Sequence, residues 1–153
     1  GVQTCALPIS ITRNATTAGA EGGCQAEVGS ASAMAASAAV ELFGGTPRQC
    51  MDAASFAMVN ILGLVCDPIG GLVENPCQNR NAMGASNALI SAELSLAGVK
   101  SITPIDETIG VMYAVGRSIP SELRETSLGG MAVAKSACEN CMACANKRNK
   151  MKK

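Results

Sequence analysis

The chain has 153 residues with 12 basic and 12 acidic side chains, so it lacks the positive excess typical of nucleic-acid-binding proteins. Hydrophobic residues make up 48% of it, yet it has only one Tyr, two Phe and no Trp, and such small apolar side chains favour closely packed helices. It has no stretch apolar enough to cross a bilayer and no positively charged, apolar leader. We expect a soluble, cytoplasmic protein that binds neither nucleic acid nor membrane.

The two ends of the chain differ in character from its middle. Residues 1–9 (GVQTCALPI) look like the translation of a short-read sequencing adaptor, so we expect that they, including Cys5, are not native and that the gene extends upstream. Residues 10–130 are predicted to form the main domain. Residues 131–153 end in a basic run that is interpreted as a solvated, flexible tail.

Helical patterns dominate the middle, and caps and glycines mark their ends. The expected helices cover residues 24–43, closed by Gly44-Gly45; 47–62, opened by Thr46-Pro47; 81–97, closed by Gly98; about 104–116, capped by Thr103; and a short one within 120–127. No alternating strand pattern of useful length is present. The predicted fold is a compact all-α domain.

One long irregular loop interrupts the helices. Residues 63–80 contain three glycines and two prolines, which exclude a continuous helix, and a loop of this length inside a compact domain is usually functional. It carries Cys66 and Cys77. Cys50, in contrast, falls among alanines on a predicted helix and is interpreted as a small core residue.

Cys24, Cys66 and Cys77 each lie in a bend rich in glycine or proline, in a chain with no histidine. Their spacing is neither that of a zinc ribbon nor that of a ferredoxin, and spacing alone leaves two alternatives open, a metal site or ordinary core cysteines. Cys24 follows Gly22-Gly23 at an expected helix start, where amide dipoles favour a thiolate. Three thiolates without a fourth suit an iron–sulfur cluster that leaves one iron open.

Four stretches carry a resemblance to a known family: NATTAGAEGGCQAEVGSASAMAA, ELFGGTP, ILGLVCDPIGGLVENPCQNRNAMGASNAL and GRSIPSELRETSLGG. Together they span most of the chain, which resembles the C-terminal half of the α chain of iron–sulfur-dependent L-serine dehydratase (L-serine ammonia-lyase). The resemblance implies that Cys24, Cys66 and Cys77 hold a [4Fe–4S] cluster. It also implies L-serine as substrate, β-elimination to pyruvate and ammonia, and assembly with a β chain or into a homo-oligomer.

The implied chemistry needs a Lewis acid, because hydroxide is a poor leaving group. Pyridoxal phosphate is the other route to this reaction, but neither Lys100 nor Lys135, the lysines before the tail, lies in a recognisable cofactor context. With no histidine here, a histidine base would come from upstream sequence or from a β chain. The catalytic residues are therefore left unassigned.

Asn14, Arg80 and Asn81 are the candidates for contacting substrate or supporting the cluster, because polar groups beside a cysteine loop can bond sulfide or carboxylate. An ordinary loop salt bridge is the alternative for Arg80.

Cys138, Cys141 and Cys144 form a C-x2-C-x2-C motif, in which neighbouring thiolates can reach one ion. Three readings stay open: an auxiliary metal or redox site, a cap on the catalytic cluster, or an unliganded tail. If these were the main ligands, the protein would instead be a non-catalytic iron–sulfur or zinc protein.

Overall fold

The computed structural model describes residues 2–140, without the side chains of residues 2–5, 138 and 140. Seven α-helices lie in this part of the chain, and no strand does, which confirms the all-α prediction. None of these helices is long and apolar enough to cross a membrane. The helices are α1 (Val2–Asn14), α2 (Gly19–Gly22), α3 (Ser30–Leu42), α4 (Pro47–Asn60), α5 (Cys77–Leu96), α6 (Ile105–Ser118) and α7 (Lys135–Asn140). A π-helical turn η1 (Gln25–Gly29) leads into α3, and three 3-10 turns, η2 (Ile69–Gly71), η3 (Ser121–Leu123) and η4 (Gly130–Val133), lie in the connections.

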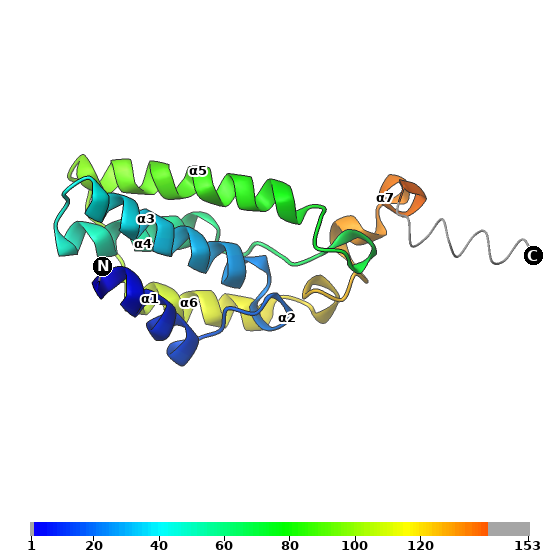
Figure 1. Ribbon diagram of the computed structural model, residues 1–153. Helices are drawn as coiled ribbons and strands as arrows, with labels where there is room; N and C mark the ends of the chain where they lie inside the picture. The colour runs from blue at the N-terminus through cyan, green and yellow to red at the C-terminus, as the bar shows by residue number, and fades with distance from the viewer. Residues whose placement is uncertain (1, 141–153) are drawn as a thin grey trace, which may run out of the picture.

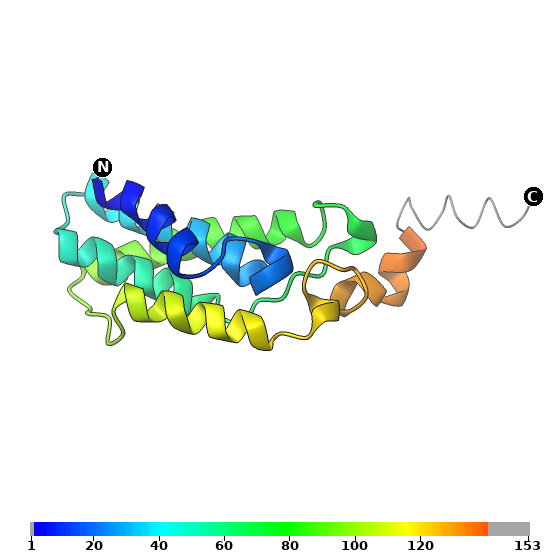
Figure 2. The same ribbon diagram turned by 90° about the horizontal axis from the view of Figure 1, so that it is seen from below.

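Helices α3, α4 and α5 pack against one another along most of their lengths, and α1 and α6 cover the opposite side of α3 and α4 from α5 (Figure 1). The core between them is built largely from alanines, whose small side chains let the helix axes approach closely. The larger buried side chains Ile11, Met58, Ile109 and Met112 fill the remaining space. Figure 2 shows that the long bundle helices end together and that α7 lies beyond them.

The start of α4 follows the prediction from Thr46-Pro47. The Thr46 side chain accepts a hydrogen bond from the Gln49 N–H, and the Gln49 side chain accepts one from the Thr46 N–H, which completes a capping box. Cys50, one turn later, is 2% exposed and lies in the core, as predicted.

One predicted helix start, that of α5, and one predicted cap, that of α6, are wrong. Helix α5 begins at Cys77 instead of residue 81, because Pro76 is tolerated immediately before a first turn, whose N–H groups need no intrahelical partner. Helix α6 is not capped by the Thr103 side chain: Pro104 is its N-cap, and the Thr103 carbonyl instead accepts a hydrogen bond from Ser55 Oγ at 2.8 Å.

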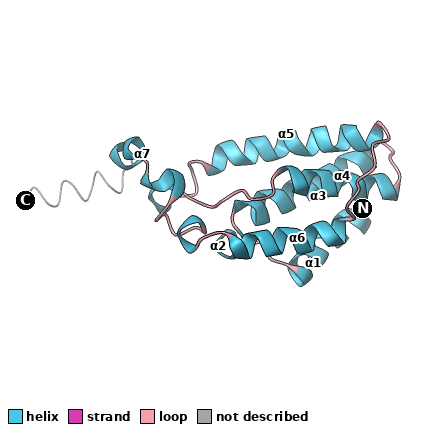
Figure 3. Ribbon diagram, turned by 180° about the vertical axis from the view of Figure 1, so that it is seen from behind, coloured by secondary structure: helices cyan, strands magenta, loops and turns pink. Residues whose placement is uncertain are grey.

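Two further segments differ from expectation. Residues 2–14 form a helix that the sequence reading did not anticipate, and its Leu7 and Ile11 are buried in the core. The short helix expected within residues 120–127 shrinks to the single 3-10 turn η3. The chain after η3 is an irregular loop that leads to η4 and α7 (Figure 3), and a single bridge at Arg124 pairs it with Cys66.

Candidate metal centre

The three predicted ligands lie toward one end of the bundle, on three different segments. Cys24 immediately precedes η1, Cys66 lies in the connection between α4 and α5, and Cys77 is the first residue of α5. The Gln25 N–H donates to Leu64 O at 2.9 Å, so the first of these segments is tied directly to the second.

Cys66 is held in place through its own backbone. Its N–H donates to Leu123 O at 2.8 Å, and its carbonyl accepts from the Glu125 N–H at 2.7 Å. These two bonds form an isolated parallel bridge between Cys66 and Arg124, two segments far apart in the chain. The connection is irregular in conformation but its backbone polar groups are paired at the cysteine, which gives this ligand a fixed position.

Gln25 fixes the segment that carries Cys24. Its side chain is 1% exposed, and its amide nitrogen donates to Gly22 O and to Met112 O, both at 2.9 Å. Its amide oxygen accepts from the Gly63 N–H at 2.8 Å. One buried side chain therefore joins η1, α6 and the start of the cysteine-bearing connection.

The thiols of Cys24 and Cys66 are buried together with Val28 and Ile61 in a small apolar cluster separate from the main core. Burial raises the pKa of the Cys24 thiol to about 11, and the positive charge of Arg80 partly opposes this rise. Burial also raises the pKa of the Cys66 thiol to about 12. A protein without metal therefore keeps both sulfurs protonated at neutral pH.

The three sulfurs are near enough to influence one another. Charge on Cys24 or on Cys77 raises the pKa of the Cys66 thiol further, and charge on Cys77 does the same to Cys24. Among the described residues no three Cys, Asp or Glu side chains are arranged to hold a single metal ion. A cubic four-iron cluster, however, takes each thiolate on a different iron, so its ligands stand farther apart than those of one ion. Three soft sulfur ligands that lie near one another, two of them in an apolar cluster, fit such a group.

Two carboxylates lie beside these thiols. The charge of Glu27 and the charge of Glu125 both raise the pKa of Cys66. Burial, and then the charge of Glu125, raises the pKa of the Glu27 carboxyl, while a hydrogen bond from the Gly19 N–H opposes that rise. The site thus combines thiols, two acidic groups and the guanidinium of Arg80.

The three predicted substrate contacts are placed very differently. Arg80 lies one turn after Cys77 and reaches toward Cys24, but it is ion-paired with Asp67. Asn81 is exposed and lines a groove of about 270 Å³ between α3 and α5. Asn14 lies at the end of α1, where its amide nitrogen donates to Ser10 O at 2.9 Å. Of the three, the structure brings only Arg80 into contact with a cysteine side chain.

The sequence reading missed Gln25, Asp67 and Glu125. Nothing in the sequence distinguishes Asp67 from an ordinary solvated carboxylate in a loop. Cys141 and Cys144 lie outside the described residues, as does the side chain of Cys138, so the structure leaves their assignment as a prediction.

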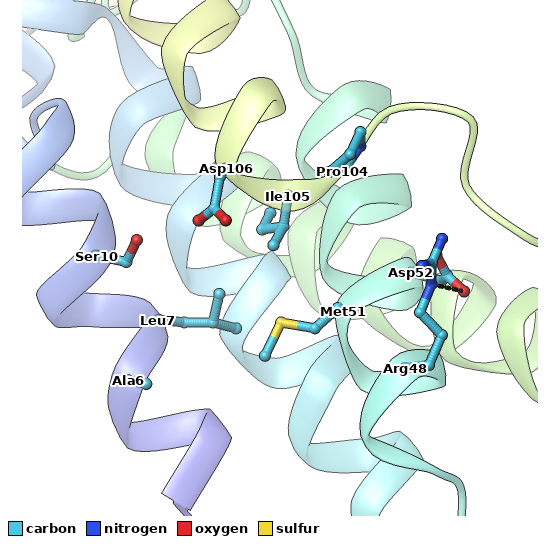
Figure 4. Close-up of a pocket in the computed structure, with 9 residues that line it drawn as sticks. All are labelled: Ala6, Leu7, Ser10, Arg48, Met51, Asp52, Pro104, Ile105 and Asp106. Atoms are coloured by element: carbon cyan, nitrogen blue, oxygen red, sulfur yellow. Dashed lines mark hydrogen bonds and ion pairs between the residues drawn. The ribbon is translucent and has the colours of Figure 1, made fainter.

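A cavity of about 430 Å³ lies near the other end of the bundle, where α4 and α6 begin and α1 passes them (Figure 4). Leu7, Met51 and Ile105 give it an apolar wall, and Arg48 and Asp52 form an ion pair at its edge. None of its described lining residues is a cysteine, and it lies apart from the three predicted ligands.

The sequence profile of the family described as serine dehydratase alpha chain matches residues 4–132. The chain belongs to this family. The L-serine dehydratase, alpha chain, of Peptoniphilus asaccharolyticus is 62% identical over 125 residues, which cover 82% of this chain and 43% of that protein. The probable L-serine dehydratase, alpha chain, of Bacillus subtilis (strain 168) is 58% identical over 122 residues, covering 80% and 41%. These matches confirm the resemblance seen in the cysteine motifs.

A third serine dehydratase relative, the probable L-serine dehydratase, alpha chain, of Latilactobacillus sakei, is 57% identical over 127 residues, covering 83% of this chain and 61% of that protein. The chain therefore spans between about two fifths and three fifths of the length of these relatives.

Proposed function

We propose that this chain is the cluster-bearing part of an L-serine ammonia-lyase, which converts L-serine to pyruvate and ammonia with a [4Fe–4S] cluster held by Cys24, Cys66 and Cys77. The observation that carries the proposal is the grouping of these three cysteines at one end of a serine dehydratase domain, where a backbone hydrogen bond from the Gln25 N–H to Leu64 O joins the Cys24 segment to the Cys66 segment. When bound, the cluster supplies an iron without a cysteine ligand, which acts as a Lewis acid toward the substrate.

The residues of this chain would hold and shape the site. Burial raises the pKa of the Cys24 and Cys66 thiols, so cluster assembly would release protons from these two groups. Val28 and Ile61 exclude water from Cys24 and Cys66. Glu27 and Glu125 lie at the same place and can accept or hold a proton there.

The complete activity requires more than this chain in our proposal. No histidine is present, so a histidine base would come from a segment outside this sequence or from a partner. The relatives are named as alpha chains, and we propose a β chain, or a second copy of the protein, as that partner. The substrate carboxylate would bind where the site remains open to solvent beside Cys77, which is only half-buried.

Anaerobic reconstitution with iron and sulfide tests the ligand assignment. We expect Cys24→Ser, Cys66→Ser and Cys77→Ser each to lose the visible sulfide-to-iron absorbance. Cys50→Ser is the matched control, because it alters an equally buried cysteine away from the site. If Cys66→Ser keeps the full absorbance while Cys141→Ser loses it, the ligands are those of the tail and the proposal is wrong.

The activity is tested on the complete α chain together with its β chain, by following pyruvate release from L-serine without oxygen. We expect activity that is lost on exposure to air, because an iron without a protein ligand is open to oxidants. An enzyme that stays fully active in air would contradict the proposed role of the cluster.

A further inference from the structure

Asp67 and Arg80 form a buried ion pair at the metal centre. Arg80 Nη1 lies 2.7 Å from Asp67 Oδ1, and the two side chains are 15% and 3% exposed. The same nitrogen donates a hydrogen bond to Val65 O at 2.8 Å. Among the described residues Asp67 Oδ1 accepts no well-aligned hydrogen bond, so the attraction between opposite charges holds the pair together. Asp67 and Arg80 therefore neutralise each other's charge in a largely buried position.

The second oxygen of Asp67 ties a distant segment to the pair. Asp67 Oδ2 accepts a hydrogen bond from the Met131 N–H at 2.6 Å. The preceding residue, Gly130, has a φ of +60°, and a Cβ added there would meet Asp67 Cβ at 2.8 Å. Position 130 therefore requires a glycine, because its φ is positive and because a side chain there would collide with Asp67. Asp67 thus holds two groups at once: Oδ1 pairs with Arg80, and Oδ2 binds the backbone of η4.

The pair lies next to all three cysteine-bearing segments. Asp67 is the residue directly after Cys66, and Arg80 lies one helical turn after Cys77 on α5. The Arg80 guanidinium is also placed to donate a hydrogen bond to the sulfur of Cys24.

We propose that the Asp67–Arg80 pair is a positioning device that fixes the three cysteine segments relative to one another before any metal binds. Arg80 is then not a substrate contact, because its guanidinium is already engaged by Asp67, Val65 and Cys24. Arg80 also places a positive charge near Cys24, which favours the thiolate form of that residue. The link to a cluster rests on the proposed function, whereas the fixing of the segments does not.

The first test needs no metal. In the full chain we expect Asp67→Ala to speed hydrogen exchange at the amides of Met131, Cys66 and Glu125 by at least about tenfold, because it frees two segments at once. Asp52→Ala is the matched control: Asp52 is also buried and ion-paired, with Arg48 at 3.2 Å, but at the other end of the bundle. It should leave these three amides unchanged. Unchanged protection in Asp67→Ala would overturn the proposal.

The second test measures iron and sulfide bound per chain after anaerobic reconstitution. We expect Asp67→Asn, Arg80→Gln and Arg80→Lys to bind several-fold less than the unaltered chain, and Asp52→Asn to bind as much as it does. Lysine should not rescue, because it lacks the planar fork that serves three partners. Full cluster content in Arg80→Gln, with only a higher KM for L-serine in the complete enzyme, would make Arg80 a substrate contact and overturn the proposal.

The two tests separate the two hypotheses. If the unaltered chain binds no cluster while the exchange result holds, the proposed function fails and the positioning role stands. If the unaltered chain binds a cluster but the Asp67 and Arg80 variants bind as much with unchanged exchange, the positioning role fails alone.

Discussion

Gly116 is the point where α6 touches the segment that carries Cys24. A Cβ added at Gly116 would lie 2.7 Å from Gly22 Cα, 2.9 Å from Gly22 O and 3.0 Å from Gln25 Nε2. Two of these three atoms belong to the backbone, which cannot step aside as the end of a flexible side chain can. We therefore expect Gly116→Ala to push α6 away from α2 and η1.

The size of the effect follows from two opposing contributions. Overpacking of a tight contact costs about 1–3 kcal/mol, and replacing glycine with alanine inside a helix returns about 1 kcal/mol. We expect Gly116→Ala to lower the free energy of unfolding by up to about 2 kcal/mol. Gly110 lies on the same helix with nothing within 4 Å of its added Cβ, so Gly110→Ala should raise stability by about 0.5–1 kcal/mol.

Urea unfolding followed by circular dichroism at a fixed temperature measures both variants against the unaltered protein. The two substitutions are chemically identical and share one helix, so their difference isolates the contact with Gly22. Equal effects of the two substitutions, or a more stable Gly116→Ala, would refute the close approach of α6 to the Cys24 segment.

Three further predictions address the caps, the buried amide and the thiols. Thr46→Ala should cost about 1 kcal/mol of unfolding free energy by removing the capping box of α4, and Thr46→Ser should restore most of it. Gln25→Glu should destabilise the protein more than Gln25→Met in urea unfolding at neutral pH, because its carboxylate would face two carbonyl oxygens where the amide nitrogen now donates. In the metal-free protein the thiol pKa values of Cys24 and Cys66 are raised from 9.0 to about 11 and about 12, so their contribution to stability is fully present below pH 9 and is lost as pH rises through these values. Unfolding midpoints measured from pH 8 to 10.5 should therefore fall less steeply in the double variant Cys24→Ala/Cys66→Ala; equal slopes would contradict the raised values.

The sequence correctly predicted features that depend on residues close together in the chain, such as the start of α4 and the burial of Cys50. Thr46-Pro47 marks the start of α4 because both the cap and the first-turn proline act within four residues. Cys50 was correctly placed in the core because its neighbours on the helix are alanines. The extent of the cysteine-bearing loop was overestimated at its end, because Pro76 reads equally well as a helix breaker and as the residue before a helix.

Features that depend on contacts between residues far apart in the chain could not be predicted from the sequence. The bridge between Cys66 and Arg124 joins two segments with no strand pattern, so no periodicity announces it. Asp67 was overlooked because a carboxylate in a loop is ordinarily solvated, and only the folded chain shows Arg80 beside it and an amide from the η4 turn on its other oxygen. Arg80 was singled out as a residue that contacts substrate or supports the cluster, with a loop salt bridge as the alternative, and the structure shows that salt bridge, with Asp67.

The irregular backbone around the cysteines has a physical reason that connects these observations. Thiols that must meet at one point from three directions cannot all lie on the straight bundle helices, so two of them stand just where a helix begins and the third in an extended connection. Such backbone is costly unless its polar groups are paired, and here the bonds to Leu64 O, Leu123 O and Cys66 O supply the pairing. Burial raises the pKa of the Cys24 and Cys66 thiols, so without metal both resist the negative charge that the proposed cluster would require. A fixed positive charge opposes this rise in pKa. Arg80, which is ion-paired with Asp67, supplies such a charge beside Cys24.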